Sequence, residues 1–336
     1  MQPILLISIL LAYFGVLLII SWITSRNADN ESFFIGNHKS PWFLVAFGMI
    51  GTSISGITFV SIPGFVLNTG FSYFPMVLGN FVGYILIATI LMPMYYKLNL
   101  TSIYSYLEVR FGKFSYKTGA SFFLLSRTMG SAIRLFLAAG VLQVAIFSAW
   151  NVPFWVTVLV TIIFIWVYTF KGGIKTIIWT DSIQTLFFLV AVGITVYVIS
   201  DKLGYSFGSM VQSIADSKYS KVLFFDDFAG DKRHFIKQFL SGILICVSMT
   251  GLDQDLMQKN LSCRNIKDAK KNMFWFSFIM VFVNIMFLSL GALLYIFADS
   301  KGLTLPASTD DVYPYIATSG ALPLITAVVF LLDRKS

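Results

Sequence analysis

Charged residues, histidine and cysteine are all scarce in this chain. Only 12% of its 336 residues are charged, and it contains two histidines and two cysteines. His38 and His234 are expected on opposite sides of a membrane, so they cannot form a metal site together. Cys246 lies in an apolar segment and Cys263 in a polar loop, so we expect no disulfide between them. No Cys–His or Ser–His pair falls within one predicted helix, and we therefore expect the protein not to be an enzyme.

Apolar residues are abundant instead. They make up 57% of the chain, and the mean hydropathy is +0.79. A run of about 20 apolar residues is long enough to cross a bilayer as a helix. We predict nine such segments, at 4–23, 43–67, 73–96, 119–149, 152–170, 176–200, 237–257, 273–298 and 317–332. The pattern predicts an all-α polytopic protein of the plasma membrane, surrounded by the lipid bilayer.

The basic residues predict how the chain is oriented in the membrane. The first apolar segment has no Lys or Arg before Arg26 and no small-residue cleavage site, so we expect a retained helix that starts outside the cell. Basic residues then concentrate in the predicted cytoplasmic loops, such as 97–117 and 259–272, whereas the external loop 201–236 is rich in Asp. Because the net charge of +8 is spread over several loops, it predicts no nucleic-acid partner.

Residues 51–58 interrupt the second apolar segment. Their sequence, GTSISGIT, places two glycines and four hydroxyl side chains where membrane helices normally carry Leu, Ile, Phe or Val. Pro63 and Gly64 follow shortly after. Glycine and proline loosen a helix, and the carbonyls that a break releases are tolerated at membrane depth only where they line a cavity or hold an ion. We therefore predict a binding site at this segment.

A second interruption occurs in the seventh apolar segment, where residues 248–255 read SMTGLDQD. The two interruptions are five segments apart, and interrupted helices at corresponding positions are typical of inverted repeats in secondary transporters. A five-segment repeat would cover segments two to six and begin again at segment seven. We expect the second repeat to be incomplete in this chain, because only the seventh to ninth segments remain for it.

Asp181 lies near the start of the sixth apolar segment. Gly172 and Gly173 favour a turn and Lys175 suits the headgroup level, which places Asp181 roughly 6–9 Å into the membrane at 1.5 Å per residue. A carboxylate inside a membrane is costly, so it needs a partner. That partner is either a cation or a hydrogen-bonding Ser or Thr near the interface, and the sequence leaves both alternatives open.

Four motifs resemble those of the sodium:solute symporter family, which contains transporters of sugars, proline and sialic acid. They are SGITFVSIPG at 55–64, YSYLEVRFG at 104–112, GGIKTIIWTDSIQ at 172–184 and GLDQDLMQKNLS at 251–262. They occur in the family's order and span nearly the whole chain. The resemblance implies a fold of two inverted five-helix repeats preceded by one extra helix.

The resemblance also implies how the chain is divided. It places an extra N-terminal transmembrane helix at 1–26 and a first inverted repeat, with core helices 1–5, at 42–200. An external loop at 201–236 follows. A partial second repeat at 237–336 then contains core helices 6 and 7 and the start of helix 8.

Sodium is the coupling ion of the family that the motifs resemble. The resemblance implies that the backbone carbonyls of Gly51 and Ile54 hold the main sodium ion, with further oxygens from a small-Ser-Ser cluster in the eighth core helix. Residues 322–332 resemble the start of that helix, and the serine cluster is absent from this chain. Asp181 matches an aspartate that serves a second sodium site in some members.

The hydroxyl run of the first broken helix most resembles the sialic acid branch of the family. The resemblance implies that Ser53, Ser55 and Thr58 face the solute, together with the amide of Asn80. Sialic acid also needs a cation for its carboxylate. The candidates for this cation are Arg127 and Arg134, which lie seven residues apart and therefore on one face of a helix. The sequence does not choose between them.

Two methionines distinguish the chain from the sugar branch. Met249 stands where sugar transporters have an aromatic inner gate, and Met280 where some have a substrate-facing lysine. We therefore expect sodium-coupled symport of a small organic solute, a sugar or an acidic sugar such as sialic acid, across a bacterial inner membrane. The alternatives are another solute (proline, a hexose or inositol), proton coupling through Asp181, or a truncated remnant that does not transport.

Overall fold

The computed structural model describes most of the chain, and its regular elements are helices. The described residues are 3–25, 40–54, 56–98, 100, 102–145, 147–169 and 173–318. The predicted all-α architecture is confirmed within these ranges. The ninth predicted segment, 317–332, lies outside them except for its first two residues.

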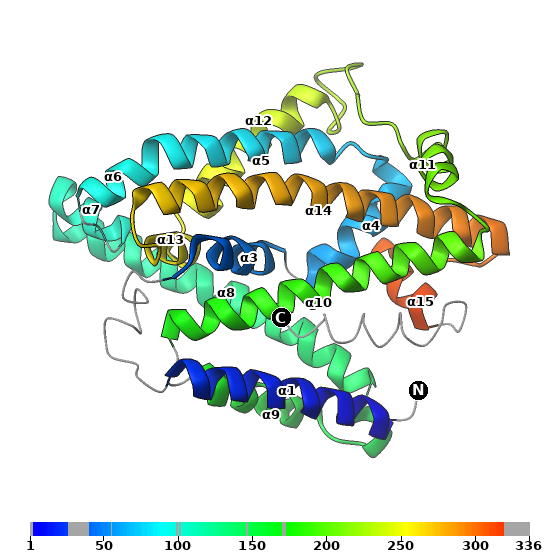
Figure 1. Cartoon of the computed structure of the whole chain (residues 1–336), viewed down its shortest axis with the longest axis horizontal. Helices are drawn as coiled ribbons and strands as arrows, with labels where there is room; N and C mark the ends of the chain where they lie inside the picture. The colour runs from blue at the N-terminus through cyan, green and yellow to red at the C-terminus, as the bar shows by residue number, and fades with distance from the viewer. Residues whose placement is uncertain are drawn as a thin grey trace.

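Three long helical stretches run side by side through the molecule (Figure 1). They are Phe74–Lys97, Thr176–Lys202 and Ile266–Lys301, and each is long and apolar enough to cross a membrane. The first combines α5 (Phe74–Leu86), the π-helix η2 (Ile87–Leu91) and α6 (Met92–Lys97), while the others belong to α10 (Gly173–Lys202) and α14 (Ile266–Lys301).

A fourth stretch passes the same test only as a bent pair. Phe235–Gly251, which combines α12 (Phe235–Cys246) and the π-helix η4 (Val247–Gly251), meets α13 (Gln254–Leu261) at 66°. Other apolar helices contain shorter apolar stretches: α1 (Pro3–Ser25), α3 (Trp42–Ser53), α4 (Gly56–Thr69) and α9 (Phe154–Thr169). The predicted segments within the described residues are therefore helical, but not all of them are straight single spans.

Short helices gather at the two ends of the long ones. In Figure 1, α6, α13 and α7 (Ile103–Phe111) lie at one end of the molecule. The opposite end holds α11 (Phe207–Ala215), α15 (Val312–Thr318) and the 3₁₀ turn η5 (Thr309–Asp311). The long α8 (Lys113–Ala145) crosses behind, and a 3₁₀ turn, η3 (Phe147–Trp150), follows it.

Glycines let the backbones of neighbouring helices touch. A Cβ added to Gly79 of α5 would lie 2.0 Å from the carbonyl oxygen of Phe239 in α12, and one on Gly242 would lie 2.2 Å from that of Met76. Likewise, a Cβ on Gly51 of α3 would lie 2.3 Å from Thr185 Oγ1 in α10. These approaches fix α5 on α12 and α3 on α10, which positions the first interruption directly against the helix that carries the predicted intramembrane carboxylate.

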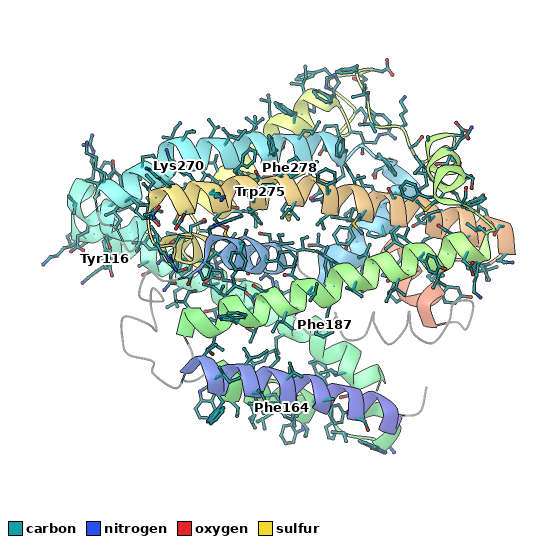
Figure 2. The ribbon with its side chains drawn as sticks, viewed as in Figure 1. Tyr116, Phe164, Phe187, Lys270, Trp275 and Phe278 are labelled. Atoms are coloured by element: carbon teal, nitrogen blue, oxygen red, sulfur yellow. The ribbon has the colours of Figure 1, made fainter. Side chains whose placement is uncertain are left out.

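Large apolar side chains cover the outer faces of the helices. Phe187 on α10 and Trp275 and Phe278 on α14 are exposed, and Figure 2 labels all three. The central helix α14 instead buries other aromatic residues, among them Phe276 and Phe287. An apolar exterior around a packed core suits the lipid environment that the composition predicts.

Candidate functional site

The first predicted interruption is present. α3 ends at Ser53, and Ile54 has an extended backbone (φ −96°, ψ 99°) whose N–H still donates to Ile50 O at 2.9 Å. α4 begins two residues later, at Gly56. The last carbonyls of a helix have no donor within that helix, so the last turn of α3, which contains Gly51, can offer carbonyl oxygens to a ligand at the break. Of the predicted ligand positions here, Ser55 lies outside the described residues.

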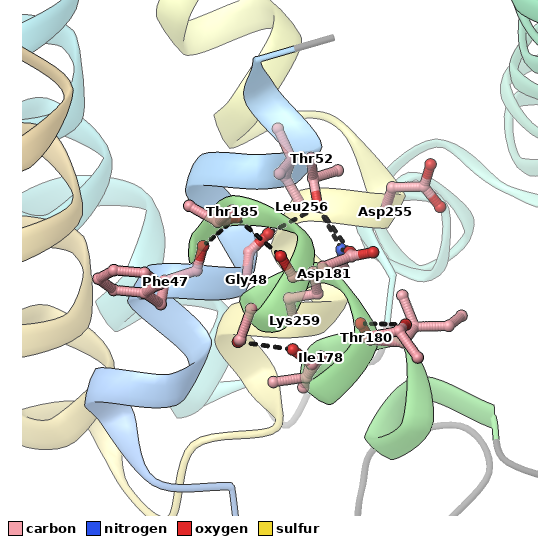
Figure 3. Close-up of polar contacts among 12 residues, drawn as sticks. Phe47, Gly48, Thr52, Ile178, Thr180, Asp181, Thr185, Asp255, Leu256 and Lys259 are labelled. Atoms are coloured by element: carbon pink, nitrogen blue, oxygen red, sulfur yellow. Dashed lines mark hydrogen bonds and ion pairs between the residues drawn. The ribbon is translucent and has the colours of Figure 1, made fainter. Parts of the chain in front are cut away.

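Hydroxyl groups of α10 tie it to the backbone of α3. Ser182 Oγ donates to the carbonyl oxygen of Leu44 at 2.9 Å, and Thr185 Oγ1 donates to that of Phe47 at 3.0 Å. These two contacts lie one helical turn apart on both helices, so they set the register between them. The register brings Asp181, one residue before Ser182, to the last turn of α3 (Figure 3).

Asp181 has two partners that come from different broken helices. Thr52 Oγ1 of α3 donates to Asp181 Oδ2 at 3.0 Å. The Lys259 ammonium group of α13 donates to the same carboxylate oxygen and to the Thr52 hydroxyl (Figure 3). The Lys259 side chain is only 4% exposed. The two alternatives for Asp181, a cation and a hydroxyl partner, are therefore both realised by the chain itself.

Sequence reasoning did not find Lys259. It is 78 residues from Asp181, and it lies in a short polar helix next to acidic residues that resembles a solvated surface segment. A signal was nevertheless present, because Lys259 shares one face of α13 with Leu256, which is buried.

The second predicted interruption is also present. The π-helix η4 ends at Gly251, Leu252 follows, and Asp253 caps the new helix α13. The Asp253 side chain accepts hydrogen bonds from the backbone N–H groups of Asp255 (3.0 Å) and Leu256 (3.3 Å). An aspartate at this position satisfies two of the N–H groups that a new helix leaves unpaired.

The two candidate arginines have different surroundings. Arg127 of α8 forms an ion pair with Asp253, and its Nη1 lies 3.6 Å from Asp255 Oδ2. Arg134, two turns further along α8, is exposed and has no ion pair among the described residues. The structure therefore uses Arg127 at the second break, where its charge is neutralised.

Five buried side-chain atoms have no hydrogen-bond partner within the described structure. They are Ser53 Oγ, Asn80 Oδ1, Gln184 Nε2, Ser200 Oγ and Asn272 Oδ1. Buried polar groups are usually paired, so an unpaired group is typical of a place that water or a ligand occupies. Ser53 and Asn80 were predicted from the sequence, and Gln184, one turn beyond Asp181, was not. Thr58 is half-buried in the first turn of α4.

The described residues contain no group of three His, Cys, Asp or Glu side chains that could hold a metal ion. The oxygens at the first break belong instead to backbone carbonyls, hydroxyl groups and one carboxylate. Unwound backbone carbonyls of broken helices are the usual ligands of sodium in secondary transporters, so this set of donors fits a monovalent cation better than a transition metal.

Comparisons with known proteins agree on one family. A model of the sodium:solute symporter family matches residues 33–329. The sodium/sialic acid symporter NanT of Aliivibrio fischeri is 27% identical over 97% of this chain, and the chain spans 65% of the length of that relative. The human sodium/iodide cotransporter is also 27% identical, over 71% of this chain and 36% of its own length.

A solved structure shows the same fold. It is a sodium-coupled sialic acid symporter in its substrate-bound, outward-open state, and it superposes with a TM-score of 0.83 at 21% sequence identity. The superposition covers 98% of this chain and 71% of the other. The all-α membrane transporter fold is thereby established.

Proposed function

Because the chain belongs to the sodium:solute symporter family, we propose that it acts in the sodium-coupled symport of a small organic solute, an acidic sugar such as sialic acid, by alternating access. The proposal includes the inverted-repeat organisation expected from the sequence, with a first repeat at 42–200 and part of a second at 237–336, and a location in a bacterial inner membrane. Two bacterial relatives that match nearly the whole chain are named as sodium/sialic acid symporters.

The observation that carries the proposal is the break at Ile54. It releases the carbonyls of the last turn of α3 in the interior of a membrane protein, and it does so beside Asp181 and Thr52. In this proposal the carbonyls of Gly51 and Ile54 bind the coupling sodium ion. Asp181, which the sequence predicts for a second sodium site, lies beside this break and is paired with Lys259.

The solute is proposed to bind next to the same break. Ser53 Oγ and Asn80 Oδ1 are buried and unpaired in the structure, so a hydroxylated solute would satisfy both. Ser55 and Thr58 are the further hydroxyl candidates from the sequence. Of the two arginines proposed for the solute carboxylate, Arg134 is the stronger candidate because Asp253 and Asp255 already neutralise Arg127.

Transport requires that the ligands bind one conformation better than the other, because a ligand shifts an equilibrium only by its differential affinity. The breaks after Ser53 and after Gly251 are two places where the chain can change direction while the helices on either side keep their hydrogen bonds. Sodium bound at the first break would stabilise the outward-facing state, and the solute would then bind against the first turn of α4, which contains Thr58.

The direct test is uptake by proteoliposomes that contain the purified chain. Radiolabelled N-acetylneuraminic acid should accumulate when sodium is imposed outside, and it should not accumulate when potassium replaces sodium. Accumulation driven by a pH gradient in the absence of sodium would show that the coupling ion is a proton. Competition by excess unlabelled proline, hexose or inositol would identify another solute. Solute binding without any accumulation would contradict the transport proposal.

Replacing Thr58 by valine tests the proposed solute site. Loss of one solute hydrogen bond costs about 1–1.5 kcal/mol, so uptake at low solute concentration should fall about fivefold to tenfold. The control is Thr89→Val, because Thr89 is exposed on η2 and, among the described residues, its hydroxyl bonds to the carbonyl oxygens of Ile85 and Leu86 one turn before it. Equal uptake by Thr58→Val and Thr89→Val would remove Thr58 from the site.

A further inference from the structure

The Lys259 ammonium group already occupies the position at Asp181 that a cation would take. We propose that Lys259 is a tethered replacement for a sodium ion at this carboxylate, so that sodium does not bind at Asp181. The inference rests on the proposed function, because it assigns the ion binding of the same region. It predicts that sodium binds at the carbonyls of the first break alone.

The geometry indicates that the Lys259 ammonium group is held in a fixed position at Asp181. The ammonium group and the Thr52 hydroxyl both donate to Asp181 Oδ2, and the ammonium group also reaches Thr52 itself. Asp181 is 22% exposed and Lys259 only 4%, so water competes little for the lysine end of the pair. A lysine carries a compact point charge, which is the property that a bound monovalent ion would supply.

The charge balance supports the same conclusion. One carboxylate and one ammonium group cancel, so the pair creates no demand for another cation. The polar side chains of Gln184 and Thr185, one turn away, add no charge, and Thr185 Oγ1 donates to the backbone oxygen of Asp181 at 2.7 Å. If Lys259 were absent, Asp181 would be left with Thr52 as its partner, and a carboxylate at membrane depth would then attract a cation from solution.

The backbone around Lys259 is held on both sides. At the start of α13, Asp253 caps the helix and pairs with Arg127. At its end, Ser262 Oγ donates to the carbonyl oxygen of Lys259 at 2.7 Å, and Ser262 O accepts from the N–H of Ser40 at 3.2 Å. The position of the Lys259 ammonium group is therefore set by a helix that is anchored at both ends, and not by a freely rotating surface side chain.

Two variants with uncharged side chains test the proposal. Lys259→Met removes the charge at similar side-chain length, and the double variant Lys259→Met/Asp181→Asn removes the whole pair without leaving a buried charge. Equilibrium binding of radioactive sodium and sodium-dependent thermal stabilisation should be measured on the purified full chain in detergent. These readouts do not require transport.

We expect Lys259→Met to gain a second class of sodium site, or to bind sodium about tenfold more tightly, because the unpaired carboxylate now needs the ion. The double variant should return to the sodium isotherm of the original chain. An isotherm in Lys259→Met that equals both the original and the double variant would overturn the proposal. Should Lys259→Met fail to fold, Lys259→Gln takes its place, because its amide can still bond to Asp181.

The outcomes also separate this inference from the proposed function. An original chain that binds no sodium would contradict sodium coupling, yet a new site in Lys259→Met would still support the role of Lys259. Conversely, sodium binding by the original chain that is lost in the double variant would show that Asp181 is itself a sodium ligand, and it would overturn the inference while leaving sodium coupling in place.

Discussion

At the scale of single residues, two glycines determine how closely α5 and α12 approach. The carbonyl oxygens of Phe239 and Met76 occupy the space that Cβ atoms on Gly79 and Gly242 would need. These are backbone atoms of packed helices, so they cannot move aside as the end of a flexible side chain could. The pair matters for the proposed site because Asn80 directly follows Gly79.

Gly79→Ala is therefore expected to destabilise the protein. Overpacking of a well-packed interior costs about 1–3 kcal/mol, so the thermal unfolding midpoint in detergent should fall. Gly193→Ala is the control, because a Cβ on Gly193 of α10 meets nothing within 4 Å. That change should leave the midpoint unchanged or raise it, since alanine favours a helix by about 0.5–1 kcal/mol over glycine. Equal midpoints for both variants would contradict the packing argument.

At the scale of elements, the short helix α13 depends on the residue that caps it, Asp253. With only eight residues it has little intrinsic stability, and it begins at a 66° bend. Asp253 both caps it and pairs with Arg127, whereas Lys259 holds its other end on Asp181. The two ion pairs thus connect α13 to α8 and α10, and loosening either should release it.

Replacements of Asp253 separate the cap from the ion pair. Asparagine caps a helix about as well as aspartate, so Asp253→Asn should remove the charge of the pair and keep the cap, whereas Asp253→Ala should lose both. Loss of a cap costs about 1 kcal/mol, so amide hydrogen exchange of 254–261 should be about fivefold faster in Asp253→Ala than in Asp253→Asn.

The control for this comparison is Ser206→Ala, which removes the side chain that caps α11 at the other end of the molecule. It should speed exchange in α11 and leave 254–261 unaffected. The same exchange rate for 254–261 in Asp253→Ala and Asp253→Asn would mean that packing, and not the cap, maintains α13.

At the scale of the whole molecule, the orientation in the membrane remains a prediction from the basic loops. Cysteine labelling can test this orientation, because the two native cysteines should contribute little background. Cys246 is 4% exposed and Cys263 is fully buried. Burial raises the pKa of the Cys263 thiol to about 12, so at neutral pH the thiol stays protonated and reacts slowly with maleimides. Background labelling of the native chain should therefore be low.

An introduced cysteine should reveal the side on which each loop lies. Lys232→Cys, in the predicted external loop, should react with a membrane-impermeant maleimide on intact cells. Lys270→Cys, at the start of α14 (Figure 2), should react only after the membrane is opened. Both side chains are exposed, so access to the reagent and not burial decides the result. Labelling of Lys270→Cys on intact cells would reverse the predicted orientation.

The sequence by itself determined where the helices lie and where two of them break. Long apolar runs can satisfy their backbone in a membrane only as helices, and the structure has helices at the predicted segments that it describes. Glycine and hydroxyl residues at 51–58, and Gly251 followed by Asp253, weaken a helix locally, so both breaks were predictable without knowing their neighbours.

Only the tertiary structure decided which charges meet. Asp181 needs a partner, but nothing near it in the sequence shows that Lys259 supplies one. The sequence offers Arg127 and Arg134 equally for a solute carboxylate, and only the structure pairs Arg127 with Asp253. The physical reason is that helix formation and interruption depend on neighbours along the chain, whereas an ion pair depends on the register and bend of helices. Those are fixed by close contacts such as Gly51 on Thr185.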